Sequence, residues 1–178
     1  MNEYYVEGYT LMTFRKAIIT DIKEILTLVN QAYRGDKGWT TESSFVEGDR
    51  VVQEEVSEYL SNCTSHLFVL ELNHKIEATI CVEEQENRAY IGFFAVNPNL
   101  QAQGIGKQML NYAENFAIKE LHIYSFVMAV LETRKELIEF YCRRGYALSD
   151  KITEYPQSLN VGTPMVEDLK VVYLEKEV

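Results

Sequence analysis

The sequence predicts one domain of the α/β class (α+β in some classifications), in which strands and helices follow one another along the chain. Short apolar runs, such as 90–96 and 124–131, have the length of buried strands. Between them lie segments whose apolar residues recur at helical spacing. The 178 residues are enough for one full core, and no repeat or linker divides them. We therefore expect a single domain over 1–178, with 1–10 as an N-terminal appendage.

Turn and cap residues delimit these elements. Asn73-His74 separates two apolar runs as a hairpin turn. Thr20 is the expected cap of the first helix, and Gly145 is the expected C-terminal cap of the last. Glycines, hydroxyl residues and the only tryptophan mark 34–48 as a long loop. In chain order, we expect a strand at 11–19, helices at 20–33 and 49–60, strands at 66–72, 75–83 and 90–96, a helix from the glycine loop to about 119, a strand at 124–131, a helix at 134–144, and strands at 146–153 and 166–176.

The segment that says most about function is AYIGFFAVNPNLQAQGIGK, residues 89–107. Asn97-Pro98-Asn99 ends its apolar run, because proline lacks the N–H that a sheet requires and asparagine tolerates turn dihedral angles. The sequence QAQGIG then leads directly into a helical pattern. A strand, a glycine-bearing loop and a helix start form an anion site, because unpaired N–H groups converge there and glycines admit a phosphate close to the backbone.

Two well-known phosphate-binding motifs do not fit this loop. A Walker loop requires a glycine where Gln101 stands and a hydroxyl residue where Gln108 stands. A dinucleotide-binding fingerprint requires a third glycine at the position of Met109. The remaining pattern, Q-x-x-G-x-G, resembles the pyrophosphate loop of the GCN5-related N-acetyltransferases (the GNAT superfamily), which bind acetyl-CoA.

Two further segments carry the same resemblance. LIEFYCRRGY, residues 137–146, resembles the family's closing segment, in which a helix bears a tyrosine and a glycine–aromatic pair follows. YRGDKGWTTESSF resembles the substrate-side loop of a bacterial branch of the family. The predicted order β-α-α-β-β-β-α-β-α-β-β is that of the GNAT fold, so the resemblance covers about 12–176. It implies a single mixed, mostly antiparallel central sheet flanked by helices.

The resemblance also implies roles for individual residues. The backbone of the strand before the loop would hold the pantetheine arm of acetyl-CoA, and the Val96 amide would polarise the thioester carbonyl. Tyr141 would be the general acid, since a phenol can protonate a leaving thiolate; the alternative is a core tyrosine on a helix face. The implied cofactor-binding residues are Phe94, Ala95, Val96, Gln101, Ala102, Gln103, Gly104, Ile105, Gly106, Lys107 and Tyr141.

The general base and the nature of the acceptor are left open. Some family members use a glutamate early in the strand before the loop, but Tyr90 occupies that position. Glu132 or a chain of water molecules are the alternatives. Acidic residues near the substrate would hold a cationic acceptor, whereas Arg34 would suit a carboxylate. The residues expected to recognise the substrate, together with the loop 154–164, are Arg34, Trp39, Thr41 and Glu42.

Composition and charge exclude several other classes. The formal net charge of −10 argues against nucleic acid as a partner and agrees with a cationic amine. No apolar run approaches the ~20 residues of a membrane span, and MNEYYVEGYT lacks the apolar core of a signal peptide. Three scattered cysteines suit a reducing cytosol, and neither they nor the histidines have metal-ligand spacing. We expect a cytoplasmic monomer or homodimer that uses acetyl-CoA and no metal.

The leading hypothesis is an acyl-CoA-dependent N-acetyltransferase that transfers acetyl from acetyl-CoA to a primary amine by direct attack in a ternary complex. The acceptor would be a small-molecule amine or a protein amine. A non-catalytic acyl-CoA-binding regulatory module is the alternative from another class. Tyr141 and the intact glycine loop favour the enzyme, and the absent strand glutamate favours the module. O-acyl transfer, or a different acyl donor, is a further alternative.

Overall fold

The computed structural model describes residues 2–6, 9–39, 41–156 and 161–178. The strands are β1 (Asn2–Val6), β2 (Tyr9–Lys16), β3 (Val46–Glu47), β4 (Ser65–Leu72), β5 (Lys75–Gln85), β6 (Arg88–Val96), β7 (Ser125–Leu131), β8 (Ala147–Glu154), β9 (Thr163–Pro164) and β10 (Lys170–Glu177). The helices are α1 (Ile22–Arg34), α2 (Gln53–Ser61), α3 (Ile105–Phe116) and α4 (Lys135–Cys142), with short helical turns η1 (Ile19–Asp21), η2 (Pro98–Leu100) and η3 (Ala117–Leu121).

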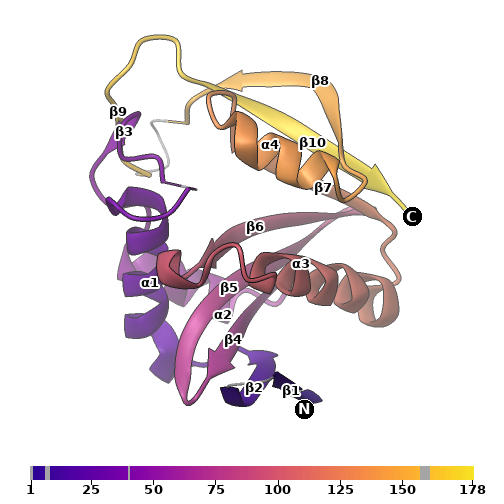
Figure 1. Cartoon of the computed structure of the whole chain (residues 1–178). Helices are drawn as coiled ribbons and strands as arrows, with labels where there is room; N and C mark the ends of the chain where they lie inside the picture. Colours follow the sequence, from indigo (N-terminus) through magenta and orange to yellow (C-terminus); the bar gives the residue numbers. More distant parts are fainter. Residues whose placement is uncertain (1, 7–8, 40, 157–160) are drawn as a thin grey trace.

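Within the described residues, one large sheet has the strand order β1-β2-β4-β5-β6-β7-β10-β8, and β3 pairs separately with β9. The pairings of the large sheet are antiparallel except that of β6 with β7, which is parallel. Figure 1 shows α3 in front of the strands that precede β7, and α4 in front of β7 and β10. The predicted mixed, mostly antiparallel α/β fold is confirmed.

The central strands supply two cores, one on each face of the sheet. On β4, Phe68 and Leu70 pack in the core beneath α3, whereas Leu67 and Val69 pack in the core beneath α1 and α2. All four side chains are buried. Because successive side chains of a strand point to opposite faces, a strand that is apolar at every position must be covered on both sides.

The first helix begins at Ile22 rather than after a cap at Thr20. Asp21 ends the short turn η1, where its carboxylate accepts the Ile18 N–H at 2.8 Å. The same carboxylate pairs with Arg15 near the end of β2 at 2.6 Å and so fixes the turn that follows this strand. The acidic residue therefore takes the capping position, and the prediction of a Thr20 cap is wrong.

The second helix begins at Gln53, later than the predicted residue 49. The Asn30 Oδ1 atom accepts the N–H groups of Arg50 at 2.8 Å and Val51 at 3.1 Å. The Asn30 Nδ2 atom donates to the Val51 carbonyl at 3.0 Å. These bonds join the backbone at 50–51 to α1, so the helix starts only after them.

The predicted turn residues have positive φ angles, as tight turns and helix ends often require. Asn73 and His74 have φ of 49° and 65° and join β4 to β5, which confirms the hairpin. Gly145 has φ of 90°, and the Tyr146 N–H donates to the Tyr141 carbonyl at 3.3 Å, which confirms the cap that ends α4.

The N-terminal segment extends the sheet. Asn2–Val6 form β1, which pairs antiparallel with β2 at the edge. The segment 1–10, expected to be an appendage, therefore contributes an edge strand and the first residues of β2. Residues 1, 7 and 8 of that segment lie outside the described residues.

The sheet opens between β6 and β7. These strands pair at only two positions, Ala89 with Phe126 and Tyr90 with Val127. Beyond them, Phe93 has φ of 51° and the β5–β6 register shifts, which marks a bulge in β6. The bulge bends β6 away from β7, and Figure 1 shows the two ribbons diverging toward α1. The opening that results contains the candidate site described below.

A buried carboxylate joins the two parts of the sheet near this opening. Glu114 on α3 accepts a hydrogen bond from the Tyr146 hydroxyl at 2.9 Å and from the Lys176 ammonium at 2.7 Å. Tyr146 and Lys176 belong to the part of the chain that follows β7, whereas α3 packs on the part before it. Burial, reinforced by the neighbouring carboxylate, raises the pKa of Tyr146, so its phenol stays protonated as the donor.

Replacing Glu114 with alanine should lower the free energy of unfolding by about 2–3 kcal/mol, because the buried Tyr146 hydroxyl and the half-buried Lys176 ammonium lose their acceptor. Urea unfolding measures the effect. Glu120→Ala removes an exposed glutamate from the following turn η3 and should change the same free energy by less than about 0.5 kcal/mol. Equal, small effects for both variants would show that the buried carboxylate does not join the two parts.

Candidate active site

The glycine loop presents an anion-binding helix terminus to the opening. Ala102 and Gly104 have φ of 64° and 83°, so the backbone turns through left-handed conformations before α3. The first backbone bond across the start of α3 runs from Gln108 N–H to the Gly104 carbonyl at 3.1 Å. The preceding N–H groups of the helix therefore have no acceptor within the helix. No atom lies within 4 Å of the position that a Gly104 Cβ would take, so a phosphate has room there.

A first cavity, of about 340 Å³, extends from the glycine loop along β6 to α4. Trp39 and Phe140 line it, with their ring centroids 6.0 Å apart. Phe94 and Val96 contribute the wall of β6, and their alternation places the intervening Ala95 in the opposite core. The lining therefore combines the glycine loop at one part with aromatic side chains at another, which suits a ligand that has both an anionic and an apolar part.

Gln101 fixes the loop to its surroundings. Its Oε1 atom accepts the Trp39 N–H at 3.0 Å, and its Nε2 atom lies 3.5 Å from the Val96 carbonyl. The side chain of Ile105 is buried in the core, while that of Gln103 is exposed. The predicted loop residues that line the first cavity are Gln101, Ala102, Gly104, Gly106 and Lys107.

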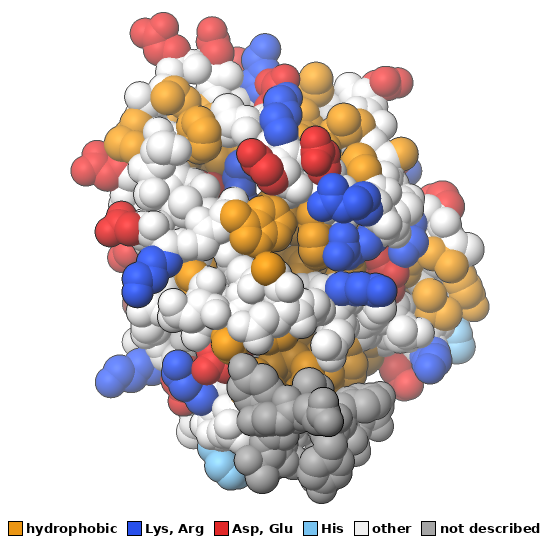
Figure 2. Space-filling view, viewed as in Figure 1, with side chains coloured by type: hydrophobic (Ala, Val, Ile, Leu, Met, Phe, Trp, Pro, Cys, Tyr) orange, Lys and Arg blue, Asp and Glu red, His pale blue; other side chains and the backbone are white. Residues whose placement is uncertain are grey.

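Cations gather beside this cavity in a chain whose net charge is −10. Figure 2 shows Lys and Arg side chains around the C-terminal end of α4. The Arg144 guanidinium lies 3.4 Å above the Phe140 ring, and its buried Nε atom has no hydrogen-bond partner among the described residues. Burial and the adjacent Arg143 lower the pKa of Arg144. Arg144 and Lys107 line the cavity, so an anionic ligand would relieve this local excess of positive charge.

A second cavity, of about 260 Å³, occupies the opening between β6 and β7. Five residues line both cavities and mark their junction: Tyr33, Phe94, Arg134, Leu137 and Tyr141. The Tyr33 hydroxyl donates to the Phe94 carbonyl at 3.2 Å, at the bulge in β6. Two ligands that entered from opposite sides would therefore meet at this junction.

Tyr141 lies at the junction, and only 5% of its surface is exposed. Its ring contacts those of Phe94 and Tyr146, with centroids 6.4 Å and 5.9 Å away. Burial raises the pKa of Tyr141, with a smaller contribution from Tyr33, so the phenol keeps its proton at neutral pH. A protonated phenol among aromatic rings therefore lies at the junction.

The Val96 amide faces away from the neighbouring strand β5. The Asn97 N–H donates to the Glu77 carbonyl on β5 at 2.8 Å. Because successive N–H groups of a strand point to opposite sides, the Val96 N–H points away from β5 and toward the opening. A hydrogen-bond donor therefore faces the opening, on the strand whose Val96 side chain lines the first cavity.

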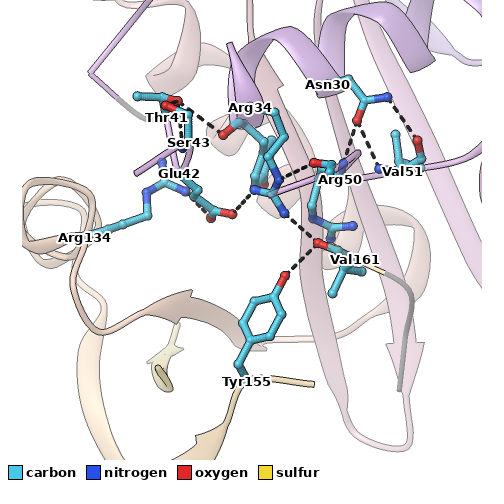
Figure 3. Close-up of polar contacts among 12 residues, drawn as sticks. Asn30, Arg34, Thr41, Glu42, Ser43, Arg50, Val51, Arg134, Tyr155 and Val161 are labelled. Atoms are coloured by element: carbon cyan, nitrogen blue, oxygen red, sulfur yellow. Dashed lines mark hydrogen bonds and ion pairs between the residues drawn. The ribbon is translucent and has the colours of Figure 1, made fainter. Parts of the chain in front are cut away.

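A carboxylate between two guanidinium groups forms one wall of the second cavity (Figure 3). Glu42 accepts from Arg34 at 2.5 Å and from Arg134 at 2.7 Å. Arg34 also donates to the carbonyls of Gly48 at 3.0 Å and Val161 at 2.6 Å. This arrangement fastens the loop before α2 to α1 and to the start of α4.

The four residues expected to recognise the substrate are therefore not gathered in one place. Glu42 lines the second cavity, and Arg34 lies behind it. Trp39 lines the first cavity, and Thr41 donates to the Gly35 carbonyl at 2.7 Å within its own loop. In the loop 154–164, residues 157–160 lie outside the described residues.

Sequence reasoning did not name Arg50, and it included Tyr33 and Tyr155 only as members of the segment YRGDKGWTTESSF and of the loop 154–164; all three line the second cavity. Arg50 lies before α2, where no motif distinguishes it, whereas Tyr33 lies near the end of α1. The Tyr155 hydroxyl donates to the Val161 carbonyl at 2.7 Å, and Figure 3 shows its ring projecting toward the Arg34–Glu42 pair. Their importance becomes visible only in three dimensions.

The general base stays unassigned. Burial raises the pKa of Tyr90 to about 12, so this residue is a poor base at neutral pH. Glu132 is absent from the linings of the two cavities among the described residues. The Glu42 carboxylate lines the second cavity, but two guanidinium groups hold it. A chain of water molecules remains open as the alternative.

Residues 23–146 match the model of the Acetyltransferase (GNAT) family, which is more than half of the chain. The chain belongs to this family and is an acyl-CoA-dependent N-acetyltransferase. Membership favours the catalytic interpretation over the non-catalytic acyl-CoA-binding module. Acetyl-CoA is therefore its acyl donor, as it is for this family.

Individual relatives agree with this assignment. The S-alkylcysteine N-acetyltransferase of Bacillus subtilis is 27% identical over 146 residues, which cover 75% of this chain and 77% of the relative. An N-acetyltransferase of Staphylococcus aureus has the same fold, with a TM-score of 0.71, 16% identity and coverage of 93% and 97%. A Bacillus anthracis acetyltransferase in complex with acetyl coenzyme A matches with a TM-score of 0.56, 19% identity and coverage of 68% and 67%.

Two features are absent from the residues that the structure describes. No helix there is long and apolar enough to cross a membrane. The same residues contain no group of three or more His, Cys, Asp or Glu side chains placed to hold a metal ion.

Gly104→Val should weaken acetyl-CoA binding at least about tenfold, because a branched side chain would fill the space above the loop. Calorimetric titration measures the dissociation constant. Gly48→Val is the matched control, since Gly48 has a similar φ of 88° but lies away from the first cavity. Unchanged affinity in a folded Gly104 variant would remove the loop from the binding site.

Proposed function

We propose that this enzyme transfers the acetyl group of acetyl-CoA to the primary amine of a small molecule, by direct attack in a ternary complex. The observation that carries the proposal is the junction of two cavities at Phe94 and Tyr141. One cavity has an anion-binding end, and the other is small and lies between strands. The relative that acts on S-alkylcysteine supports a small-molecule acceptor over a protein.

The residues that would hold acetyl-CoA follow from the first cavity. The N–H groups of the glycine loop and Arg144 would bind the phosphates, and the diverging backbone of β6 would bind the pantetheine arm. Once bound, acetyl-CoA supplies the acetyl thioester. The Val96 N–H would stabilise the negative charge that develops on the carbonyl oxygen.

In the proposed transfer, each bond that forms is matched by one that breaks, and the enzyme regains the proton that it gives. The neutral amine forms the C–N bond as the C–S bond breaks, and the Tyr141 phenol gives its proton to the departing sulfur. The new amide releases one proton, which returns through water to Tyr141. An acceptor that arrives as an ammonium must first lose a further proton to water or to a base.

The assay that tests the proposal measures thiol release from acetyl-CoA across small primary amines, with acetylated peptides scored by mass spectrometry. We expect release well above hydrolysis with small amines and little with peptides. Tight acetyl-CoA binding with no thiol release for any amine would contradict the proposed reaction.

Tyr141→Phe should lower turnover roughly 10- to 1,000-fold and leave acetyl-CoA affinity nearly unchanged, because only the proton donor is lost. Tyr124→Phe is the control, since Tyr124 is 49% exposed and outside both cavities. Full turnover in the Tyr141 variant would reduce this residue to a packing role.

Turnover should rise with pH between about 6 and 9, as the neutral fraction of an amine with pKa near ~10.4 increases. Tyr141 acts in its protonated form, and burial raises its pKa above the usual value. The rate should therefore show no falling limb within this range. A decline that begins below pH 9 would show that the pKa of the donor lies below the usual value of a tyrosine.

A further inference from the structure

The second cavity has aromatic and apolar walls with a cationic end. Tyr90, Tyr155 and Tyr173 line it, together with Met128 and Val130 of β7. Its charged lining among the described residues consists of two guanidinium groups, those of Arg50 and Arg134, and one carboxylate, that of Glu42. The wall itself therefore carries one more positive than negative charge.

The guanidinium groups at the second cavity differ in their hydrogen-bond partners within the protein. Arg134 pairs with Glu42 at 2.7 Å, and Arg34 behind it is engaged by the same carboxylate and two backbone carbonyls. The Arg50 Nη1 atom is buried and has no hydrogen-bond partner among the described residues. It lies 3.6 Å from the Glu55 carboxylate, an ion pair too long for a hydrogen bond.

Arg50 is also held in position by the fold. Its backbone N–H donates to the Asn30 side chain on α1 at 2.8 Å, and its guanidinium lies 5.4 Å from the centroid of the Tyr33 ring. A buried guanidinium N–H that has no acceptor lowers the stability of the folded protein. A ligand oxygen that accepted this hydrogen bond would offset the cost. Arginine suits this role because its planar guanidinium matches a carboxylate.

We propose that Arg50 binds a carboxylate of the acceptor, so that the substrate is a small amine carrying both a carboxylate and an apolar side chain. The inference rests on the proposed acetyl transfer to a small amine. With the carboxylate at Arg50, the amine reaches toward Tyr33 and Tyr141 at the junction, and the apolar group packs against Tyr155 and Tyr173. A cavity of about 260 Å³ suits a molecule the size of a free amino acid.

The test compares apolar amino acids with their amides and with the amines that lack the carboxylate, by thiol release from acetyl-CoA. We expect wild-type kcat/KM to be roughly 10- to 100-fold higher for the acid than for its amide, because the amide lacks the charge. Arg50→Met should remove this preference mainly through a higher KM for the acid. Arg50→Lys should restore part of it.

The control variant is Arg88→Met, which removes an exposed arginine paired with Glu175 and should keep the acid preference. Calorimetric titration with acetyl-CoA checks that the Arg50 variants retain the donor site. Equal wild-type rates for acids and amides, or an undiminished acid preference in a folded Arg50→Met, would overturn the assignment while leaving acetyl transfer intact. Absence of thiol release with every amine would instead overturn the proposed function, and this assignment with it.

Discussion

The separation of β6 from β7 is the constraint on which the site depends. A parallel pair normally exchanges hydrogen bonds along its whole length, yet here the pairing ends at Tyr90. The left-handed Phe93 that bends β6 costs about 1–3 kcal/mol for a residue with a side chain. In return, β6 directs unpaired backbone groups into a cavity where a ligand can bind them. One local distortion thus accompanies both cavities, for which we propose the acyl donor and the acceptor as ligands.

Charge is the second determinant of this site. An enzyme with a net charge of −10 has to bind an anionic donor, so its cations are placed locally. Arg144 and Lys107 serve the first cavity, while Arg50 and Arg134 line the second. Glu42 neutralises part of the second group and at the same time fixes the intervening loop. Each buried carboxylate therefore has a structural role as well as an electrostatic one.

The sequence predicted the fold because strands and helices depend on local patterns. Apolar runs located the strands, and the glycines of QAQGIG located the helix terminus that faces the first cavity. The acceptor side could not be predicted in this way. Arg50 is important because Asn30, far away in sequence, holds it beside Tyr33, and Arg34 is occupied by Glu42 only after folding. Such contacts leave no periodic signal in the chain.

Initial rates over a grid of acetyl-CoA and amine concentrations test the central claim, that two ligands meet at the junction lined by Phe94 and Tyr141. Direct transfer requires both ligands on the enzyme at once, so double-reciprocal plots should give intersecting lines. Parallel lines would indicate an acetyl-enzyme formed before the amine binds. That result would contradict the account, because the two cavities would then not need to be filled together.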